Sequence, residues 1–105
     1  MRAVIEAQAC DVLMPDLQRI GGFSEMRRVT ALAASYDLPV SPHFFTEYSQ
    51  CIAGSTPGCI SLEHIPWFED LFHESMVLEN GELLIPERPG TGYTFNQEVI
   101  KTYLL

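Results

Sequence analysis

The chain has 105 residues, which is room for one domain at most, and its hydrophobic content of 47% is that of a globular protein. Its formal net charge of −8 repels phosphate backbones, which argues against nucleic acid as a partner. No apolar run approaches the roughly 20 residues that span a bilayer, and the N-terminus lacks the apolar core of a signal peptide. The sequence therefore predicts a cytoplasmic protein with no membrane partner.

The three cysteines, Cys10, Cys51 and Cys59, are odd in number and lie far apart in the sequence. A disulfide framework or a zinc site requires closely spaced pairs, and the sequence contains none. We therefore predict that the cysteines serve as small buried apolar side chains.

The chain begins with a helical pattern followed by a short apolar run. Residues 1–9 have helical character, and residues 12–15 are apolar on both faces, as in a strand buried within a parallel sheet. A glycine pair follows and allows a tight turn into the next element. Residues 23–36 carry apolar side chains at helical spacing, and Ser24 is the predicted cap of this helix.

The same alternation continues beyond this helix. Residues 39–42 and 59–62 are predicted as a second and a third strand, and residues 46–54 as the helix between them. Strands that alternate with helices across short loops are typical of parallel β/α units.

The last 40 or so residues have a different character. Residues 64–74 are rich in aromatic side chains and irregular, with a single helical turn. The tail, residues 75–105, begins with two apolar runs joined at Asn80-Gly81, the strongest short-range signal for a β-hairpin. Residues 96–105 complete the tail as a short amphipathic helix.

Each of the three predicted strands ends in a polar side chain: Asp16, His43 and Glu63. Parallel strands bring their carboxyl ends to one face of a sheet, where ligands of α/β proteins bind. Neighbouring strands lie about 4.8 Å apart, so an Asp and a His there come within hydrogen-bond distance. Such an Asp fixes the imidazole tautomer and leaves the other nitrogen as a base. Polar residues also end many strands without any function, so the pattern alone leaves both interpretations open.

The residues around these positions resemble the enolase superfamily, in particular the mandelate racemase subgroup of the mandelate racemase/muconate lactonizing enzyme family. The resemblance rests on the stretches PDLQRIGGFSE, SPHFF, LEH and PGTGY, and on the order and spacing of the Asp, His and Glu residues. Within the subgroup, SPHFFTEYS and LEHIPWFEDLF look most like the acid-sugar dehydratases.

The resemblance implies an α/β fold, namely a partial (β/α)8 TIM barrel. The chain would supply the last three β/α units, followed by a C-terminal hairpin and a short helix. A complete barrel needs about 250 residues, so residues 1–105 would form the C-terminal portion of an enolase-like barrel domain.

The resemblance also implies roles for individual residues. His43 would be the general acid/base next to a substrate carboxylate, and Asp16 would be its partner in an Asp-His dyad. Glu63 would stabilise the enediolate as it forms. Arg19 and His64 are candidate substrate-binding residues, although Arg19 also suits pairing with a nearby carboxylate and His64 suits a supporting or surface position.

The family's cofactor is Mg²⁺, and its substrates in the dehydratases are acid sugars. In the family the metal ligands lie on strands that precede the one ending at Asp16, and the ten residues available here offer no equivalent. We therefore predict no metal site among these residues and an isolated chain that is inactive. Its open sheet edges suit self-association. The alternatives are a racemase or epimerase of a 2-hydroxy acid and a non-catalytic remnant or subdomain.

Overall fold

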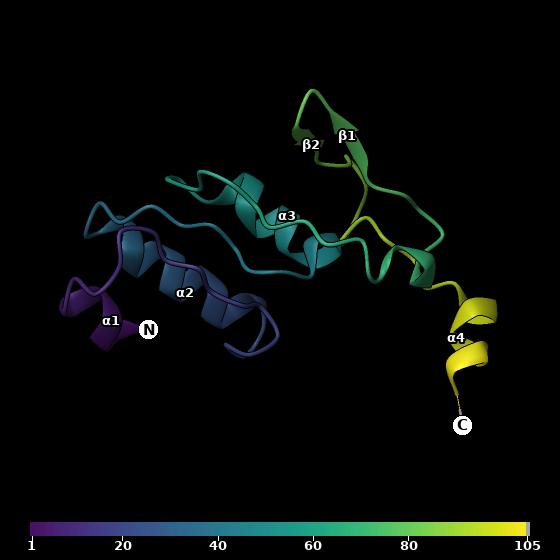
Figure 1. Cartoon of the computed structure of the whole chain (residues 1–105), viewed down its shortest axis with the longest axis horizontal. Helices are drawn as coiled ribbons and strands as arrows, with labels where there is room; N and C mark the ends of the chain where they lie inside the picture. Colours follow the sequence, from purple (N-terminus) through teal and green to yellow (C-terminus); the bar gives the residue numbers. More distant parts are fainter. Residues whose placement is uncertain (105) are drawn as a thin grey trace. The chain divides into compact units, whose positions relative to one another are not determined.

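The computed structural model describes residues 1–104, and the chain forms two compact units, the first being Met1–His64 and the second beginning at Ile65 (Figure 1). The elements of the first unit are α1 (Arg2–Glu6), α2 (Phe23–Ala34) and α3 (Thr46–Ser55). Those of the second unit are the 3-10 turn η1 (Glu69–Leu71), β1 (Val77–Glu79), β2 (Glu82–Leu84) and α4 (Gln97–Tyr103). Among the described residues, no helix is both long and apolar enough to cross a membrane.

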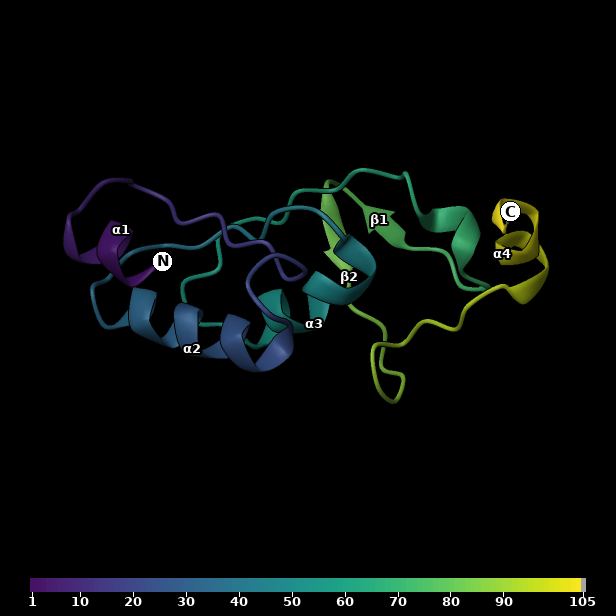
Figure 2. The same cartoon turned by 90° about the horizontal axis from the view of Figure 1, so that it is seen from below.

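The first unit is built on three extended segments that run parallel to one another. Isolated parallel bridges join Leu13 to Val40 and Val40 to Cys59, which places the middle segment between the other two. Figure 2 shows α2 and α3 together on one side of these segments. This is the arrangement of consecutive β/α units, and the predicted α/β fold of a partial barrel is confirmed.

The three segments differ from the prediction in one respect, since they are joined by isolated bridges and do not form the continuous strands 12–15, 39–42 and 59–62. Proline is the physical reason, because it has no N–H to donate to a sheet. Leu13 N donates to Pro39 O, and the next donor in that register is Pro15. In the same way Val40 N donates to Gly58 O, and the next donor is Pro42.

The entry into α2 also differs from the prediction. Ser24 does not cap this helix, because the N-cap is Gly22 and no side chain bonds to the first turn. Gly21 and Gly22 have φ angles of 105° and 87°, which side chains disfavour, so the predicted tight turn at the glycine pair is confirmed. The helix starts immediately after the turn, which leaves Ser24 inside the first turn.

Two apolar clusters hold the first unit together. One is centred on Leu13, Ala33 and Val40 and the other on Leu17, Met26 and Ile52. The three cysteines are half-buried free thiols packed against these clusters, where burial raises the pKa of Cys51 and of Cys59. They serve as apolar side chains, as predicted, although none is fully buried.

The second unit contains the predicted hairpin and helix. β1 and β2 pair in antiparallel register around Asn80 and Gly81, whose φ angles of 52° and 83° suit a tight two-residue turn. The ring of Phe72 stacks on that of Phe95 with centroids 5.1 Å apart. Asn96 caps α4 by accepting a hydrogen bond from Val99 N at 3.3 Å.

Candidate active site

Three side chains meet where the extended segments of the first unit end. Asp16 is bridged in parallel to His43, and its Oδ2 lies 3.0 Å from Nδ1 of that imidazole. The other ring nitrogen, Nε2, lies 3.5 Å from Oε2 of Glu63. The structure therefore brings together the three strand-end residues selected from the sequence, with the imidazole between two carboxylates.

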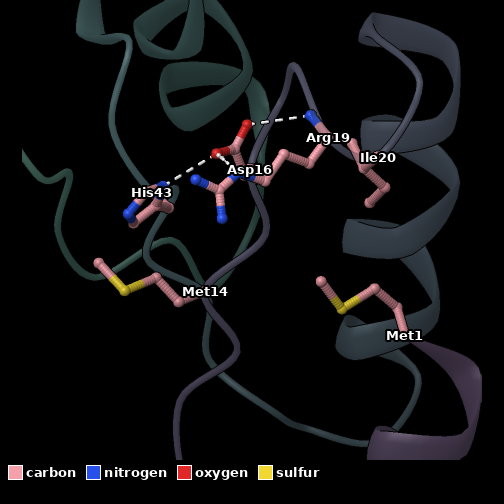
Figure 3. Close-up of a pocket in the computed structure, with 6 residues that line it drawn as sticks. All are labelled: Met1, Met14, Asp16, Arg19, Ile20 and His43. Carbon is pink, nitrogen blue, oxygen red and sulfur yellow. Dashed lines mark hydrogen bonds and ion pairs between the residues drawn. The ribbon is translucent and has the colours of Figure 1, made fainter.

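The carboxylate of Asp16 is held by four donor groups. Its Oδ1 accepts the N–H groups of Gln18 and Arg19, at 2.8 and 3.1 Å, in a tight turn. Its Oδ2 faces Nδ1 of His43 and Nε of Arg19, the latter at 3.3 Å. Figure 3 shows both side chains converging on this carboxylate. The site thus satisfies a nearly buried negative charge on all sides.

These contacts determine the charge of Asp16. Burial alone would raise its pKa, but the hydrogen bonds from Arg19 N, His43 and Gln18 N, together with the Arg19 guanidinium, outweigh burial and lower the pKa below its ordinary value. An ionised carboxylate can only accept hydrogen bonds. The proton of the Asp16–His43 bond therefore belongs to Nδ1, and in the neutral imidazole Nε2 carries the lone pair.

Glu63 is held from the backbone side. Its Oε2, the oxygen nearest to Nε2 of His43, accepts the N–H of Phe44 at 3.1 Å. The side chains of His43 and Glu63 are each 34% exposed, against 11% for Asp16. The site therefore has one carboxylate buried behind the imidazole and one open to an incoming molecule.

A pocket of about 440 Å³ opens beside the Asp16–His43 pair, lined by Met1, Met14, Asp16, Arg19, Ile20 and His43. In Figure 3 the two methionines lie below the charged groups and Ile20 lies near the helix. The side chain of Arg19 is 83% exposed, so its guanidinium is available to a ligand as well as to Asp16. The pocket combines polar groups at one end with apolar walls.

The other sequence-derived candidates are placed less centrally. His64 is half-buried next to Glu63 and is not among the residues that line the pocket. Glu47, in the first turn of α3, is only 1% exposed. Met14 and Ile20 line the pocket but carry no chemical signal in the sequence, since any apolar residue would have looked the same.

No group of three or more His, Cys, Asp or Glu side chains within residues 1–104 is arranged to hold a metal ion. Within the Asp16–His43–Glu63 group, Nδ1 of the imidazole hydrogen-bonds to Asp16 at 3.0 Å, and Nε2 lies 3.5 Å from Glu63.

Residues 1–99 match the family described as enolase C-terminal domain-like. The chain is 34% identical to D-xylonate dehydratase of Haloferax volcanii over 99% of this chain and 27% of that protein. It is 33% identical to L-talarate/galactarate dehydratase of Salmonella typhimurium, over 90% of this chain and 24% of that protein. The chain thus spans about a quarter of the length of these relatives.

Solved structures show the same similarity. The crystal structure of L-talarate dehydratase from a Polaromonas species, complexed with Mg and L-glucarate, superposes with a TM-score of 0.91 at 35% sequence identity. The match covers 95% of this chain and 28% of that one. The fold of the first and second units is therefore found, in similar sequences, within a chain several times longer.

Proposed function

The chain belongs to the enolase C-terminal domain-like family, and on that premise we propose that it carries the proton-transfer part of an acid-sugar dehydratase site. One observation carries the proposal. An ionised Asp16 holds Nδ1 of His43, and Nε2 is thereby directed to the open side where Glu63 stands. The similarity of the chain to several acid-sugar dehydratases supports the proposal, because such a reaction requires a base of this kind.

The proposed reaction begins with removal of the proton on the carbon next to the substrate carboxylate. Nε2 of His43 accepts that proton, and Asp16 stabilises the imidazolium that results. The electron pair left on carbon spreads into the carboxylate as an enediolate. We propose that Glu63, in its protonated form, donates a hydrogen bond to the charge that develops on the enediolate.

The second step expels the hydroxyl group on the neighbouring carbon. His43 returns a proton to that oxygen, which leaves as water, and the electron pair of the enediolate forms the new double bond. The imidazole ends the step neutral, so proton and charge balance over the cycle. One residue can serve in both steps because it alternates between base and acid.

Substrate binding is proposed for the exposed guanidinium of Arg19, which borders the pocket and attracts a carboxylate or a hydroxyl. His64 is proposed as a second substrate-binding residue because it directly follows Glu63, although it does not line the pocket. Dependence on Mg²⁺ is proposed only for a complete site, since the described residues do not fit the ion.

The proposal is tested by grafting this chain into a relative. Residues 1–105 replace the matching segment of the Salmonella L-talarate/galactarate dehydratase, and dehydration of galactarate is measured with Mg²⁺. We expect activity from the chimera and a loss of about 10²–10⁴-fold in kcat on His43→Asn. His73→Asn, which alters an exposed histidine of the second unit, serves as the matched control and should leave kcat unchanged.

Two results would overturn the proposal. One is a folded chimera without activity, which would favour a non-catalytic remnant. The other is full activity in the His43→Asn chimera. The isolated chain, incubated with galactarate and Mg²⁺ in deuterated water, should show no exchange of the proton next to the carboxylate, because it holds only part of the site.

A further inference from the structure

The two residues that follow His43 have an unusual backbone. Phe44 and Phe45 have φ angles of 52° and 50°, both in the left-handed region that bulky side chains rarely adopt. Together they form a strained turn, which directly follows the segment that carries the proposed base His43. Strain of this kind persists only where surrounding contacts hold it in place.

Two buried hydroxyl groups on the first turn of α3 supply those contacts. Ser49 Oγ donates to the carbonyl of Phe44 at 3.0 Å, and the carbonyl of Phe45 accepts Ser49 N, also at 3.0 Å. Thr46 Oγ1 donates to the backbone carbonyl of Glu63 at 3.0 Å. Ser49 is 0% and Thr46 1% exposed. The helix therefore clamps both the strained turn and the segment that carries Glu63.

The turn changes where the N–H of Phe44 is directed. Glu63 N donates to Pro42 O, so a ladder continued from that pair would join the Phe44 N–H to the backbone carbonyl of Glu63. The N–H instead donates to Oε2 of Glu63 at 3.1 Å. That oxygen is the one 3.5 Å from Nε2 of the imidazole.

We propose that Phe44 is a positioning residue. The turn at Phe44 and Phe45, clamped by Ser49 and Thr46, fixes the Glu63 carboxylate next to Nε2 of His43. The role of this arrangement in catalysis rests on the proposed function, but the arrangement itself is measurable in the isolated chain without turnover. The serine and threonine hydroxyls act at a distance, through the backbone, on the two groups that face the substrate.

The test is NMR of the 105-residue chain. The amide proton of Phe44 should shift during an acid titration as Glu63 becomes protonated, and Glu63→Gln should abolish that shift. Ser49→Ala should also abolish it, and should speed hydrogen exchange of the Phe44 amide on the order of tenfold. Ser49→Thr, which keeps a hydroxyl, should restore the shift. Ser55→Ala is the matched control, because it removes a hydroxyl–carbonyl bond at the other end of α3.

The proposal would be overturned if Ser49→Ala folds and its Phe44 amide proton still shifts in acid as in the unsubstituted chain. It would also be overturned if Glu63→Gln leaves the acid shift of the Phe44 amide proton unchanged. If Ser49→Ala does not fold, Thr46→Val decides in the same way, since it removes the other hydroxyl with little change in shape. If the chimera is inactive but the Phe44 amide responds as expected, only the proposed function is overturned. If the chimera is active but the Phe44 amide does not respond, only the positioning role is overturned.

Discussion

Each of the two compact units contains a carboxylate that captures backbone N–H groups, and the surroundings of the two carboxylates differ. In the first unit Asp16 accepts two backbone N–H groups and also faces an imidazole and a guanidinium. In the second unit Glu74 accepts the N–H of Thr94 at 2.6 Å at the surface. Hydrogen bonding lowers the pKa of both groups.

The difference shows what turns a common local motif into a chemical one. A surface carboxylate with one N–H joins two segments, and water replaces the contact at little cost. A nearly buried carboxylate with four donors is a fixed negative charge, and it fixes the tautomer of the imidazole beside it. The first unit therefore places buried polar groups in its candidate site, whereas the contacts of Glu74 in the second unit stabilise only the local fold.

The largest expected difference between the units concerns their apolar contacts. Met26→Ala removes a side chain that is 0% exposed and packs with Leu17 and Ile52, so it should destabilise the first unit by about 2–5 kcal/mol. Leu78→Ala on the hairpin is its control. That side chain is 53% exposed, and its loss should cost no more than about 0.5 kcal/mol. Urea denaturation followed by circular dichroism measures both, and equal losses would contradict the comparison.

The next effect concerns the charge of Asp16. Asp16→Asn keeps the size of the side chain but turns an amide N–H toward groups that are themselves donors. The expected loss is about 1–3 kcal/mol in the free energy of unfolding at neutral pH. Glu74→Gln, the same change in the second unit, should leave the unfolding curve unchanged. A larger loss of unfolding free energy from Glu74→Gln than from Asp16→Asn would contradict this comparison of the two carboxylates.

Acid should reveal the same difference. The folded-state pKa of Asp16 is lower than its unfolded value, so Asp16 stabilises the folded state above about pH 4. That contribution is lost as the pH falls through the folded-state pKa, when the carboxylate gains a proton in the folded chain as well. The acid limb of the stability curve should therefore be shallower in Asp16→Asn than in the unsubstituted chain. An unaltered limb would show that other carboxylates dominate acid unfolding.

Much of the fold and the centre of the candidate site could be predicted from the sequence. The alternation of apolar runs and helical patterns located α2, α3 and the hairpin, because period and turn chemistry are local properties. The meeting of Asp16, His43 and Glu63 followed from one topological rule on parallel strands.

Other features depend on contacts that the sequence does not display. The burial of Glu47 and the clamp by Ser49 depend on what packs against α3, and polar residues at a helix start look the same whether solvated or enclosed. The interrupted strands depend on which N–H groups the register requires, so Pro15 and Pro42 could not be judged before the pairing was known.

The smallest expected change in stability concerns the first residues of two helices, one in each unit. Asn96 caps α4 through a side-chain bond to Val99 N, so Asn96→Ala should cost about 1 kcal/mol and reduce the helicity of residues 97–103. Ser24 looks like a cap in the sequence but makes no such bond, because the chain enters α2 through left-handed glycines. Ser24→Ala should therefore change stability by less than about 0.5 kcal/mol. Chemical shifts of the two helices distinguish the outcomes, and a loss at α2 as large as that at α4 would show that Ser24 caps its helix in solution.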